Sequence, residues 1–330
     1  MAAAPARCNP AIDKPCTRIA LRLGARAMPS RERPFLALGL RLVAMAMLST
    51  MLVLVKLTGE RGMPLPETMF WRQTLPALML LGWLGARGQL HRLRTARPWV
   101  HFRRAMIGTA GMFLTLGVVQ ILPLAEATVL GFTAPVFAVI LSAFLLKERV
   151  GPWRWAAVAM GLLGIVIIAG PNQTHLPALG VAVGVGAAFM VALVSIQLRD
   201  LGRTEEPLTV VFYFSAMSAP FLALFLFRTG VHHDALGWLM LGGIGLAGLG
   251  AQLLMTAALR FGPVSSVIVM DYSQFGWATL WGWLVFAHLP PATTWIGAPI
   301  VIAAGLIIAW REHVRHRQQQ PSPPTASAMA

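Results

Sequence analysis

Long, continuously apolar segments separated by short polar or Pro/Gly-containing breaks dominate the pattern of this chain. Each segment is close to the roughly 20 residues that a helix needs to cross the hydrocarbon core of a bilayer. Strands of a transmembrane barrel would alternate polar and apolar residues, and these segments do not alternate. The pattern therefore predicts an all-α integral membrane protein with about ten transmembrane helices, at residues 35–57, 66–84, 104–121, 123–146, 154–170, 178–198, 207–227, 235–258, 263–286 and 293–310.

Composition and charge agree with a membrane location. Hydrophobic residues make up 57% of the 330 residues and charged residues 12%, whereas soluble proteins have a charged share of about 25%. Of the 27 Lys and Arg residues, 22 fall in the segments on the same side as the N-terminus and three on the opposite side. The positive-inside rule therefore predicts that both termini lie in the cytoplasm. The expected location of the protein is the inner membrane of the cell. The net charge of +15 thus reflects topology, and nucleic acid is not an expected partner.

The two ends of the chain are low in apolar residues. Residues 1–34 are Arg- and Ala-rich and residues 312–330 contain a Gln- and Pro-rich run, so both are expected to be disordered cytoplasmic tails. The two cysteines, Cys8 and Cys16, lie in the first tail at a spacing that matches no metal site. No metal site and no cofactor are expected.

Two related segments about 140 residues apart indicate an internal duplication. The sequence PLAEATVLGFTAPVFAVILSAFLLKER at 123–149 aligns with PVSSVIVMDYSQFGWATLWGWLVFAHLP at 263–290. Five helices per half is an odd number, so the second copy must enter the membrane from the opposite side. The prediction is a 5+5 inverted repeat with halves at 35–171 and 178–311, an architecture typical of secondary carriers.

Asp271 is the acidic residue expected deepest in the second half. It follows Pro263 by eight residues, which is about 12 Å of helix, and a charge at that depth needs a partner or a watery cavity. We therefore predict that Asp271 and nearby polar and aromatic residues bind the substrate. The predicted substrate-binding residues are Asp271, Tyr272, Gln274, Trp277, Trp281, Tyr213 and Gln252.

The role of the tryptophans has two readings. If Gln274, Trp277 and Trp281 line a cavity, that cavity suits a flat or cationic organic solute. The alternative is that Trp277 and Trp281 serve packing and an interface belt.

Four further residues are candidates for structural or coupling charges: Arg72, Glu126, Glu148 and His288. Arg72 is too deep to reach water easily, and Glu126 at a similar depth is its expected partner. Arg41, in contrast, is expected to extend its side chain to the cytoplasmic interface. Gly180 and Gly184 have the spacing of a close helix–helix contact.

These motifs resemble the EamA-like branch of the drug/metabolite transporter superfamily over about residues 35–311. The resemblance rests on the Pro-x-x-Glu-Ala run that starts at Pro123, on Pro135, and on the Leu-Lys-Glu-Arg sequence at 146–149, with Arg72 in the place of the family's arginine in the second helix. The VVFYFS sequence around Tyr213 resembles the subgroup that includes S-adenosylmethionine uptake carriers. The resemblance implies ten helices, cytoplasmic termini, a central cavity built from both halves and transport of small metabolites, amino acids or drugs. His288 departs from the pattern, because many members repeat the helix-ending glutamate there.

The leading hypothesis is a secondary carrier that moves a small organic metabolite by alternating access, with membrane lipids as its surroundings. The sequence contains no Walker A motif, so ATP does not drive transport directly; proton coupling, exchange and facilitated diffusion stay open.

A membrane-embedded enzyme acting on lipid is one alternative, but the predicted spans hold one deep Asp and no His, and no catalytic residue is assigned. A structural partner in a membrane complex is the other alternative, and it leaves the repeat unexplained. The sequence makes no prediction of the oligomeric state.

Overall fold

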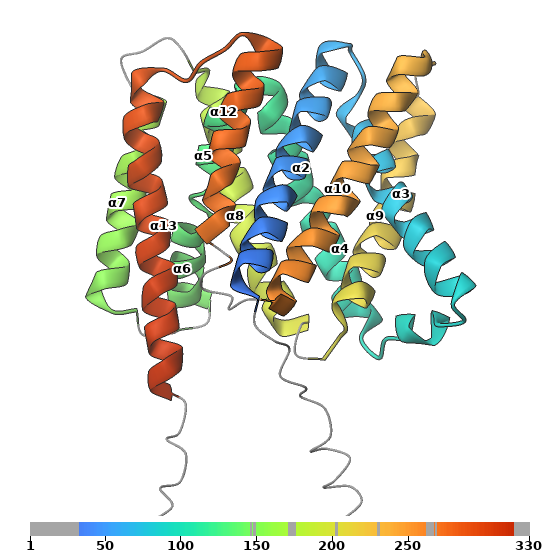
Figure 1. Ribbon diagram of the computed structural model, residues 1–330, viewed down its shortest axis with the longest axis horizontal. Helices are drawn as coiled ribbons and strands as arrows, with labels where there is room; N and C mark the ends of the chain where they lie inside the picture. The colour runs from blue at the N-terminus through green and yellow to red at the C-terminus, as the bar shows by residue number, and fades with distance from the viewer. Residues whose placement is uncertain are drawn as a thin grey trace, which may run out of the picture.

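A computed structural model describes residues 33–145, 147, 150–170, 176–201, 204–229, 232–261, 267 and 269–319. These residues form helices joined by short turns (Figure 1). The helices are α2 (Pro34–Glu60), α3 (Leu65–Ala86), η1 (Leu90–Leu93), α4 (Pro98–Ile121), α5 (Leu124–Gly131), α6 (Ala134–Leu145), α7 (Pro152–Ala169), α8 (Ala178–Leu201), α9 (Pro207–Thr229), α10 (Ala235–Phe261), η2 (Met270–Tyr272), α12 (Ser273–Phe286) and α13 (Ala292–Gln319).

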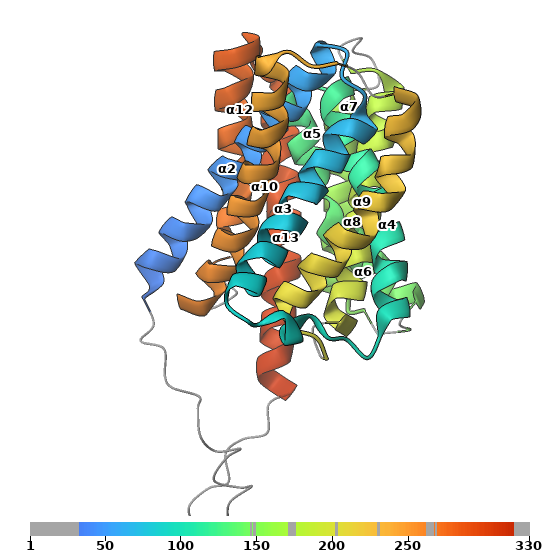
Figure 2. The same ribbon diagram turned by 90° about the vertical axis from the view of Figure 1, so that its right-hand side faces the viewer.

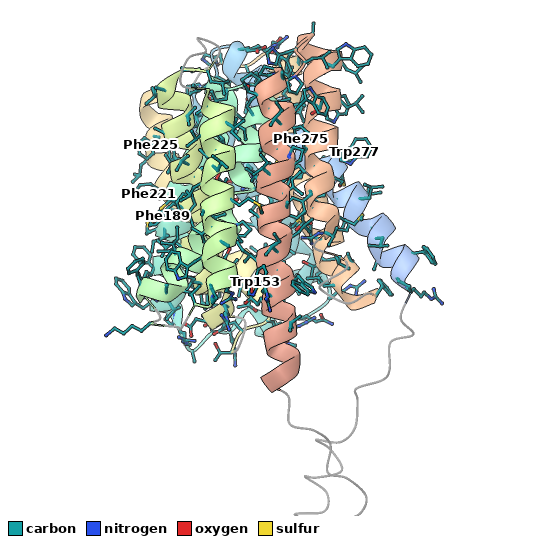
Figure 3. All side chains as sticks on the ribbon, turned by 90° about the vertical axis from the view of Figure 1, so that its left-hand side faces the viewer. Trp153, Phe189, Phe221, Phe225, Phe275 and Trp277 are labelled. Atoms are coloured by element: carbon teal, nitrogen blue, oxygen red, sulfur yellow. The ribbon has the colours of Figure 1, made fainter. Side chains whose placement is uncertain are left out.

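The predicted all-α membrane architecture is confirmed. Among the described residues, eight helices are long and apolar enough to cross a membrane, with α5 and α6 together counted as the single span Leu124–Leu145. The remaining two predicted spans are α3, which carries Glu67 and Arg72, and α12, which has 14 residues. Large apolar side chains such as Phe189 and Phe221 lie on the outer surface, as expected for a surface in contact with lipid (Figure 3).

Prolines at the first turn begin several spans. Pro34, Pro98 and Pro152 occupy the start of α2, α4 and α7, where the missing backbone N–H has no helical partner to lose. Helix α7 ends at Gly170, whose φ of 52° is a left-handed conformation that glycine adopts without a steric penalty. Local sequence therefore sets these helix ends.

The fourth span is broken at its middle. Helix α5 ends at Gly131 and α6 begins at Ala134, so that Pro135 lies in the first turn of α6. The Thr133 hydroxyl donates to the carbonyl oxygen of Leu130 at 2.6 Å across the break. The repeat pairs Gly131 with Asp271, and the ninth span is interrupted at that place too, by η2. Each repeat thus carries one discontinuous helix.

The course of the chain confirms the inverted repeat. Helix α2 begins and α13 ends at the lower end of the molecule in Figure 1, whereas α7 ends and α8 begins at the upper end. The closest helix pairs all join one repeat to the other: α2 with α10, α4 with α8, α3 with α9, and α7 with α13 (Figure 2). A pseudo-two-fold axis relates the two repeats. It maps the pair of α2 with α10 onto the pair of α8 with α4, and it maps the pair of α3 with α9 and the pair of α7 with α13 each onto itself. The repeats are therefore interlocked along their length.

The lower end in Figure 1 carries ion pairs between the repeats, and we call it the basic end. Arg92 pairs with Glu206 at 2.6 Å and Arg97 with Asp200 at 2.9 Å, which ties the segment between α3 and α4 to the end of α8 and the segment that follows it. Trp153 lies at the same end (Figure 3).

The expected close contact at Gly180 and Gly184 is confirmed. Gly180 of α8 faces Ile121 and Leu122 at the end of α4, and Gly184 faces α4 and α5: a Cβ added at Gly184 would lie 2.6 Å from Cδ1 of Leu130 and 3.2 Å from Cγ2 of Val118. The absence of a side chain at Gly184 lets the helix backbones approach closely.

Replacing Gly184 by Ala is expected to destabilise the protein by about 1–3 kcal/mol, because Leu130 and Val118 must shift to make room. Gly186→Ala is the matched control on the same helix, since a Cβ there would lie at an ordinary 3.6 Å from Leu114. Thermal unfolding of the purified proteins in detergent measures both effects. An equal melting temperature for the two variants would contradict the packing at Gly184.

Candidate functional site

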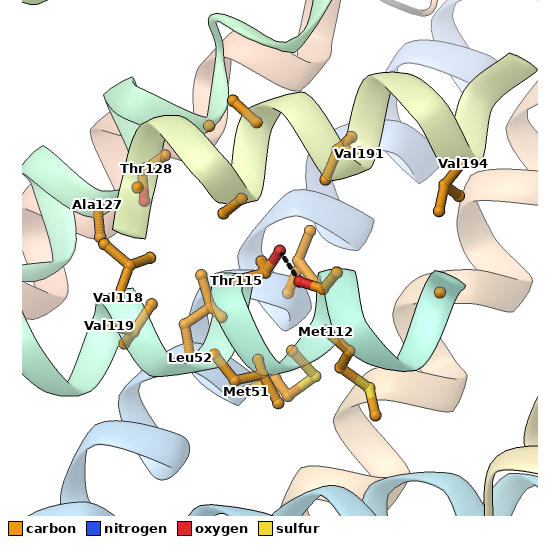
Figure 4. A pocket seen from close by; sticks show the side chains of 18 of the residues that line it. Met51, Leu52, Met112, Thr115, Val118, Val119, Ala127, Thr128, Val191 and Val194 are labelled. Carbon is orange, nitrogen blue, oxygen red and sulfur yellow. Dashed lines mark hydrogen bonds between the residues drawn. The ribbon is translucent and has the colours of Figure 1, made fainter. Parts of the chain in front are cut away.

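A central cavity of about 370 Å³ lies between the two repeats. Its walls come from α2, α3, α4, α5, α8, α9 and α12, so both halves of the chain contribute. The side chains that surround it from α8, α4, α2 and α5 are seen in Figure 4, among them Val191, Val194, Met112, Thr115, Met51, Leu52, Ala127 and Thr128. Its volume lies in the range of small-molecule sites, about 300–1,000 Å³.

Residues without large side chains make room for the cavity. Gly108 and Gly111 on α4 lie across from Gly184, Ala187 and Ala188 on α8, and all five line the space. The lining is mostly apolar, and its polar groups are few: Arg72, Arg104, Thr115, Thr128 and Gln274. A few polar groups in an apolar pocket are typical of a site that orients an organic ligand.

Arg104 places a buried guanidinium group in this cavity. Its exposed fraction is 8%, and the group lies over the ring of Phe214 at 4.4 Å. The space is available because Gly108, one turn along α4, has no side chain; a Cβ there would collide with the guanidinium. Its Nε and Nη1 are buried without a hydrogen-bond partner among the described residues.

Arg72 reaches the same cavity from α3. Its Nη1 donates to Sδ of Met112 at 2.8 Å and to Oε1 of Gln73 at 3.2 Å, and its Nε donates to Sδ of Met51 at 3.3 Å. Thioether sulfur is a weak acceptor, so these contacts position the guanidinium group of Arg72 but leave most of its hydrogen-bonding capacity unused. Because Gly108 and Met112 are about 6 Å apart along α4, the two guanidinium groups act on neighbouring parts of the cavity.

The predicted pairing of Arg72 with Glu126 is wrong. Glu126 instead faces His288 and Thr294 of the second repeat: its Oε1 lies 3.9 Å from Nε2 of His288 and 3.4 Å from the hydroxyl of Thr294. Neither Arg72 nor Arg104 forms an ion pair with a carboxylate in the described part of the chain, and the cavity lining contains no acidic residue. The cavity therefore carries positive charge, which favours a solute with carbonyl, carboxylate or other acceptor groups.

The structure also corrects the expectation for Arg41. Its side chain does not extend to the interface but pairs with Asp271 through two contacts, Nε with Oδ1, and Nη2 with Oδ2 at 2.6 Å. A third donor, Nη1, reaches the carbonyl oxygen of Met255 at 3.3 Å. Asp271 thus has the partner that its depth requires, and the pair joins α2 and α10 to the break before α12. Its charge is neutralised, so it does not make the cavity attractive to a cation.

The other predicted substrate-binding residues separate into different environments. Gln274 lines the cavity, and its backbone carbonyl accepts from the Ser49 hydroxyl at 3.5 Å. Tyr272 lies behind the cavity wall, with its ring 5.0 Å from that of Phe132. Tyr213 packs on His101, with a ring distance of 4.7 Å.

Three of the predicted residues lie away from the cavity. Gln252 is exposed on α10, and Trp281 packs against the hydrophobic core. Phe275 faces Trp295 of α13, and Trp277, two residues later, lies on the other side of α12 (Figure 3). Glu148 falls outside the described residues.

Arg104 is the principal residue that sequence reasoning missed. It stands at the start of the third predicted span, where it was counted among the topology-determining charges. The signal that could have revealed it is the row of small residues that follows on the same helix face, Gly108, Gly111 and Thr115.

Two inverted halves of five helical segments each surround a shared, ligand-sized cavity, and in the described part of the chain eight of these ten segments are long and apolar enough to cross a membrane. This arrangement defines a multi-pass membrane transporter. The EamA-like transporter family model matches twice, at residues 35–170 and 178–310, so the chain belongs to this family. It is a transporter and not an enzyme.

Several characterised relatives are similar over most of their length. The riboflavin transporter of Vibrio cholerae is 30% identical, with 78% of this chain and 87% of the relative covered. The riboflavin transporter of Rhizobium johnstonii is 29% identical, with 79% and 86% covered, and the pseudopaline exporter CntI of Pseudomonas aeruginosa is 25% identical, with 79% and 91% covered. One solved structure superposes with a TM-score of 0.58 at 24% identity over 83% of this chain and 96% of that chain, which supports the fold alone.

These relatives correct the subgroup expected from the Tyr213 neighbourhood. They are transporters of riboflavin or pseudopaline and not of S-adenosylmethionine. In the structure Tyr213 packs against His101 at the edge of the basic end.

Removing either partner of the Arg41–Asp271 pair is expected to destabilise the protein by about 1–3 kcal/mol, because the side chain of Arg41, 7% exposed, or of Asp271, 32% exposed, loses its charged partner. Arg41→Gln and Asp271→Asn should each lower the melting temperature in detergent, and the apolar double variant Arg41→Met, Asp271→Leu should recover most of the loss. Arg61→Gln is the control, because its pair with Asp234 at 3.5 Å is solvent-exposed and worth about 0–1 kcal/mol. Single variants as stable as Arg61→Gln would refute the structural role of the buried pair.

Proposed function

We propose that this chain is a secondary carrier that moves a flat organic metabolite rich in hydrogen-bond acceptors, with riboflavin as the first candidate, across the cytoplasmic membrane by alternating access. The observation that carries the proposal is the apolar cavity with two guanidinium groups and no lining acid. Transporters of riboflavin among the relatives support the choice of solute.

The chemistry of the cavity matches such a solute. Riboflavin is a fused-ring heterocycle with ring carbonyl groups and a polyol chain. Its ring can lie between the apolar walls, while its carbonyl oxygens replace the thioether sulfurs as acceptors for Arg72. Arg104 supplies unpaired donors nearby, and its stacking on Phe214 leaves a flat cation–aromatic surface beside the site.

The inverted repeat supports alternating access. The cavity is walled by both halves, so a rocking motion of one half against the other would expose it to each side in turn. The ion pairs at the basic end, Arg92 with Glu206 and Arg97 with Asp200, join the halves on one side and would have to separate when that side opens. The concentration of Lys and Arg at this end supports its placement in the cytoplasm, and with it both termini.

A carboxylate-bearing metabolite is the second candidate solute. The specific observation in its favour is again the pair of guanidinium groups, because Arg binds carboxylates through two parallel hydrogen bonds.

Solute exchange in proteoliposomes tests the proposal. Purified protein is expected to exchange labelled riboflavin against internal riboflavin with saturation, and Arg72→Gln and Arg104→Gln are each expected to weaken binding about 10- to 100-fold, since a hydrogen bond to a charged group is worth about 1.5–3 kcal/mol. Both variants are expected to fold, because neither arginine leaves a carboxylate unpaired. Arg87→Gln, at an exposed position against Trp83, is the matched control and should bind normally.

Two outcomes are informative against the proposal. Exchange that is as strong in both cavity variants as in Arg87→Gln would remove the arginines from the site. Exchange of a carboxylate-bearing metabolite without exchange of riboflavin would select the second candidate.

A further inference from the structure

A second, smaller cavity of about 260 Å³ lies between the turns at the end opposite to the basic end. Its lining joins α2 and the turn before α5 in the first repeat to the end of α12 and the turn after it in the second repeat. The lining residues are Lys56, Glu60, Pro123, Leu124, Ala125, Gly282, Phe286 and His288. Unlike the central cavity, it contains charges of both signs.

Helix α5 separates this outer cavity from the central one. Leu124 and Ala125 line the outer cavity, whereas Ala127 and Thr128 line the central cavity. Glu126 stands between these two pairs, and its exposed fraction is 0%. The Glu126 side chain lines neither cavity itself, but the residues on either side of it along α5 line one cavity each.

The partners of Glu126 come from both repeats and none binds it tightly. His288 Nε2 lies 3.9 Å from Oε1, and the Thr294 hydroxyl lies 3.4 Å from the same oxygen. Lys56 interacts with Glu126 electrostatically, but its Nζ donates to the carbonyl oxygens of Val119 and Leu122 at 3.1 Å and 2.8 Å. Oε2 of Glu126 is buried without a hydrogen-bond partner among the described residues.

The charged groups that face Glu126 are few. Helix α2 offers Lys56 and Glu60, and the turn after α12 offers His288. The described parts of α4, α8, α12 and α13 beside α5 contribute no charged side chain. Glu126 is thus buried near two basic groups, and its contacts with His288 and Thr294 are long, at 3.9 Å and 3.4 Å.

The side chain of His288 connects this carboxyl group to water. Its exposed fraction is 46%, against 0% for Glu126. An imidazole has two ring nitrogens that can each bind or release a proton, so it can pass a proton from water to a carboxylate. The second repeat holds both His288 and Thr294, so a change in the charge of Glu126 alters a contact between the halves.

We propose that Glu126 is a proton-binding site through which this carrier couples solute movement to a proton gradient. The proposal rests on the carrier function proposed above. A proton moves from outer water to the His288 imidazole and then to the Glu126 carboxylate, which becomes a neutral carboxylic acid. When the central cavity opens to the basic end, the proton leaves through that cavity and the carboxylate forms again. Neutralisation weakens the attraction between Glu126 and His288, which frees the outer ends of the two repeats to move.

Infrared difference spectroscopy tests proton binding without any solute. The full-length protein in lipid is compared between about pH 5 and about pH 8, and the carboxylic acid C=O band that appears at low pH is expected to vanish in Glu126→Gln and to shift in Glu126→Asp. Glu67→Gln is the matched control, because Glu67 is also a buried glutamate paired with a histidine, His233 at 2.7 Å, but neither of its neighbours along α3 lines a cavity, whereas both neighbours of Glu126 along α5 do. A band unchanged in Glu126→Gln would overturn the proposal.

Transport tests the coupling. Proteoliposomes are loaded with riboflavin, and a pH gradient is applied first in one direction and then in the other. For one of the two directions, the wild-type protein and Glu67→Gln are expected to accumulate riboflavin against the riboflavin concentration gradient. Glu126→Gln is expected to lose this accumulation by tenfold or more while it retains exchange at equal pH, which also shows that it folds.

Gradient-driven accumulation that persists in Glu126→Gln would overturn coupling at this site, and so would a wild-type protein whose transport does not respond to the pH gradient. Absence of riboflavin exchange in the wild type would instead reject the proposed solute, and the infrared band would still decide the proton site.

Discussion

The cost of a charge inside an apolar bundle organises this molecule. Each charged group deep in the helices must meet a counter-charge, weaker polar partners or a ligand space. Arg41 and Asp271 satisfy this requirement together, and their contact joins helices of both repeats at the break before α12. Arg72 and Arg104 satisfy it only in part, and they face the central cavity. The two arginines that lack a counter-charge therefore mark where a solute can bind.

The interlocked repeats explain how a cavity persists between tightly packed helices. Cross-repeat pairs such as α2 with α10 and α7 with α13 hold the periphery, while small residues on α4 and α8 keep the centre open. Both discontinuous helices, α5–α6 and η2–α12, lie beside this space, and a broken helix offers free backbone groups only where protein or a cavity can satisfy them. Structure and function thus depend on the same interruption in each repeat.

Contacts extend from the central cavity towards both ends of the molecule. At the basic end, Phe214 contacts Arg104 while its neighbour Tyr213 contacts His101, which lies 3.8 Å from Glu205 in the ion-paired segment between α8 and α9. At the opposite end, Glu126 lies on α5 between residues that line the central cavity and residues that line the outer one. A change at the solute site can therefore bias the contacts that join the repeats on either side.

The sequence by itself determined the helices, their approximate ends and the inverted duplication, because hydrophobic length, prolines at helix starts and an odd number of spans per half are properties of the chain alone. It also singled out Gln274 and Arg72, which both line the central cavity. Only the tertiary structure decided their partners, since distance from a helix end gives depth in the membrane but not the direction in which a side chain faces around the bundle. For that reason Arg72 and Glu126, expected at similar depth, face different neighbours, and Arg41, expected to reach the interface, instead pairs with Asp271.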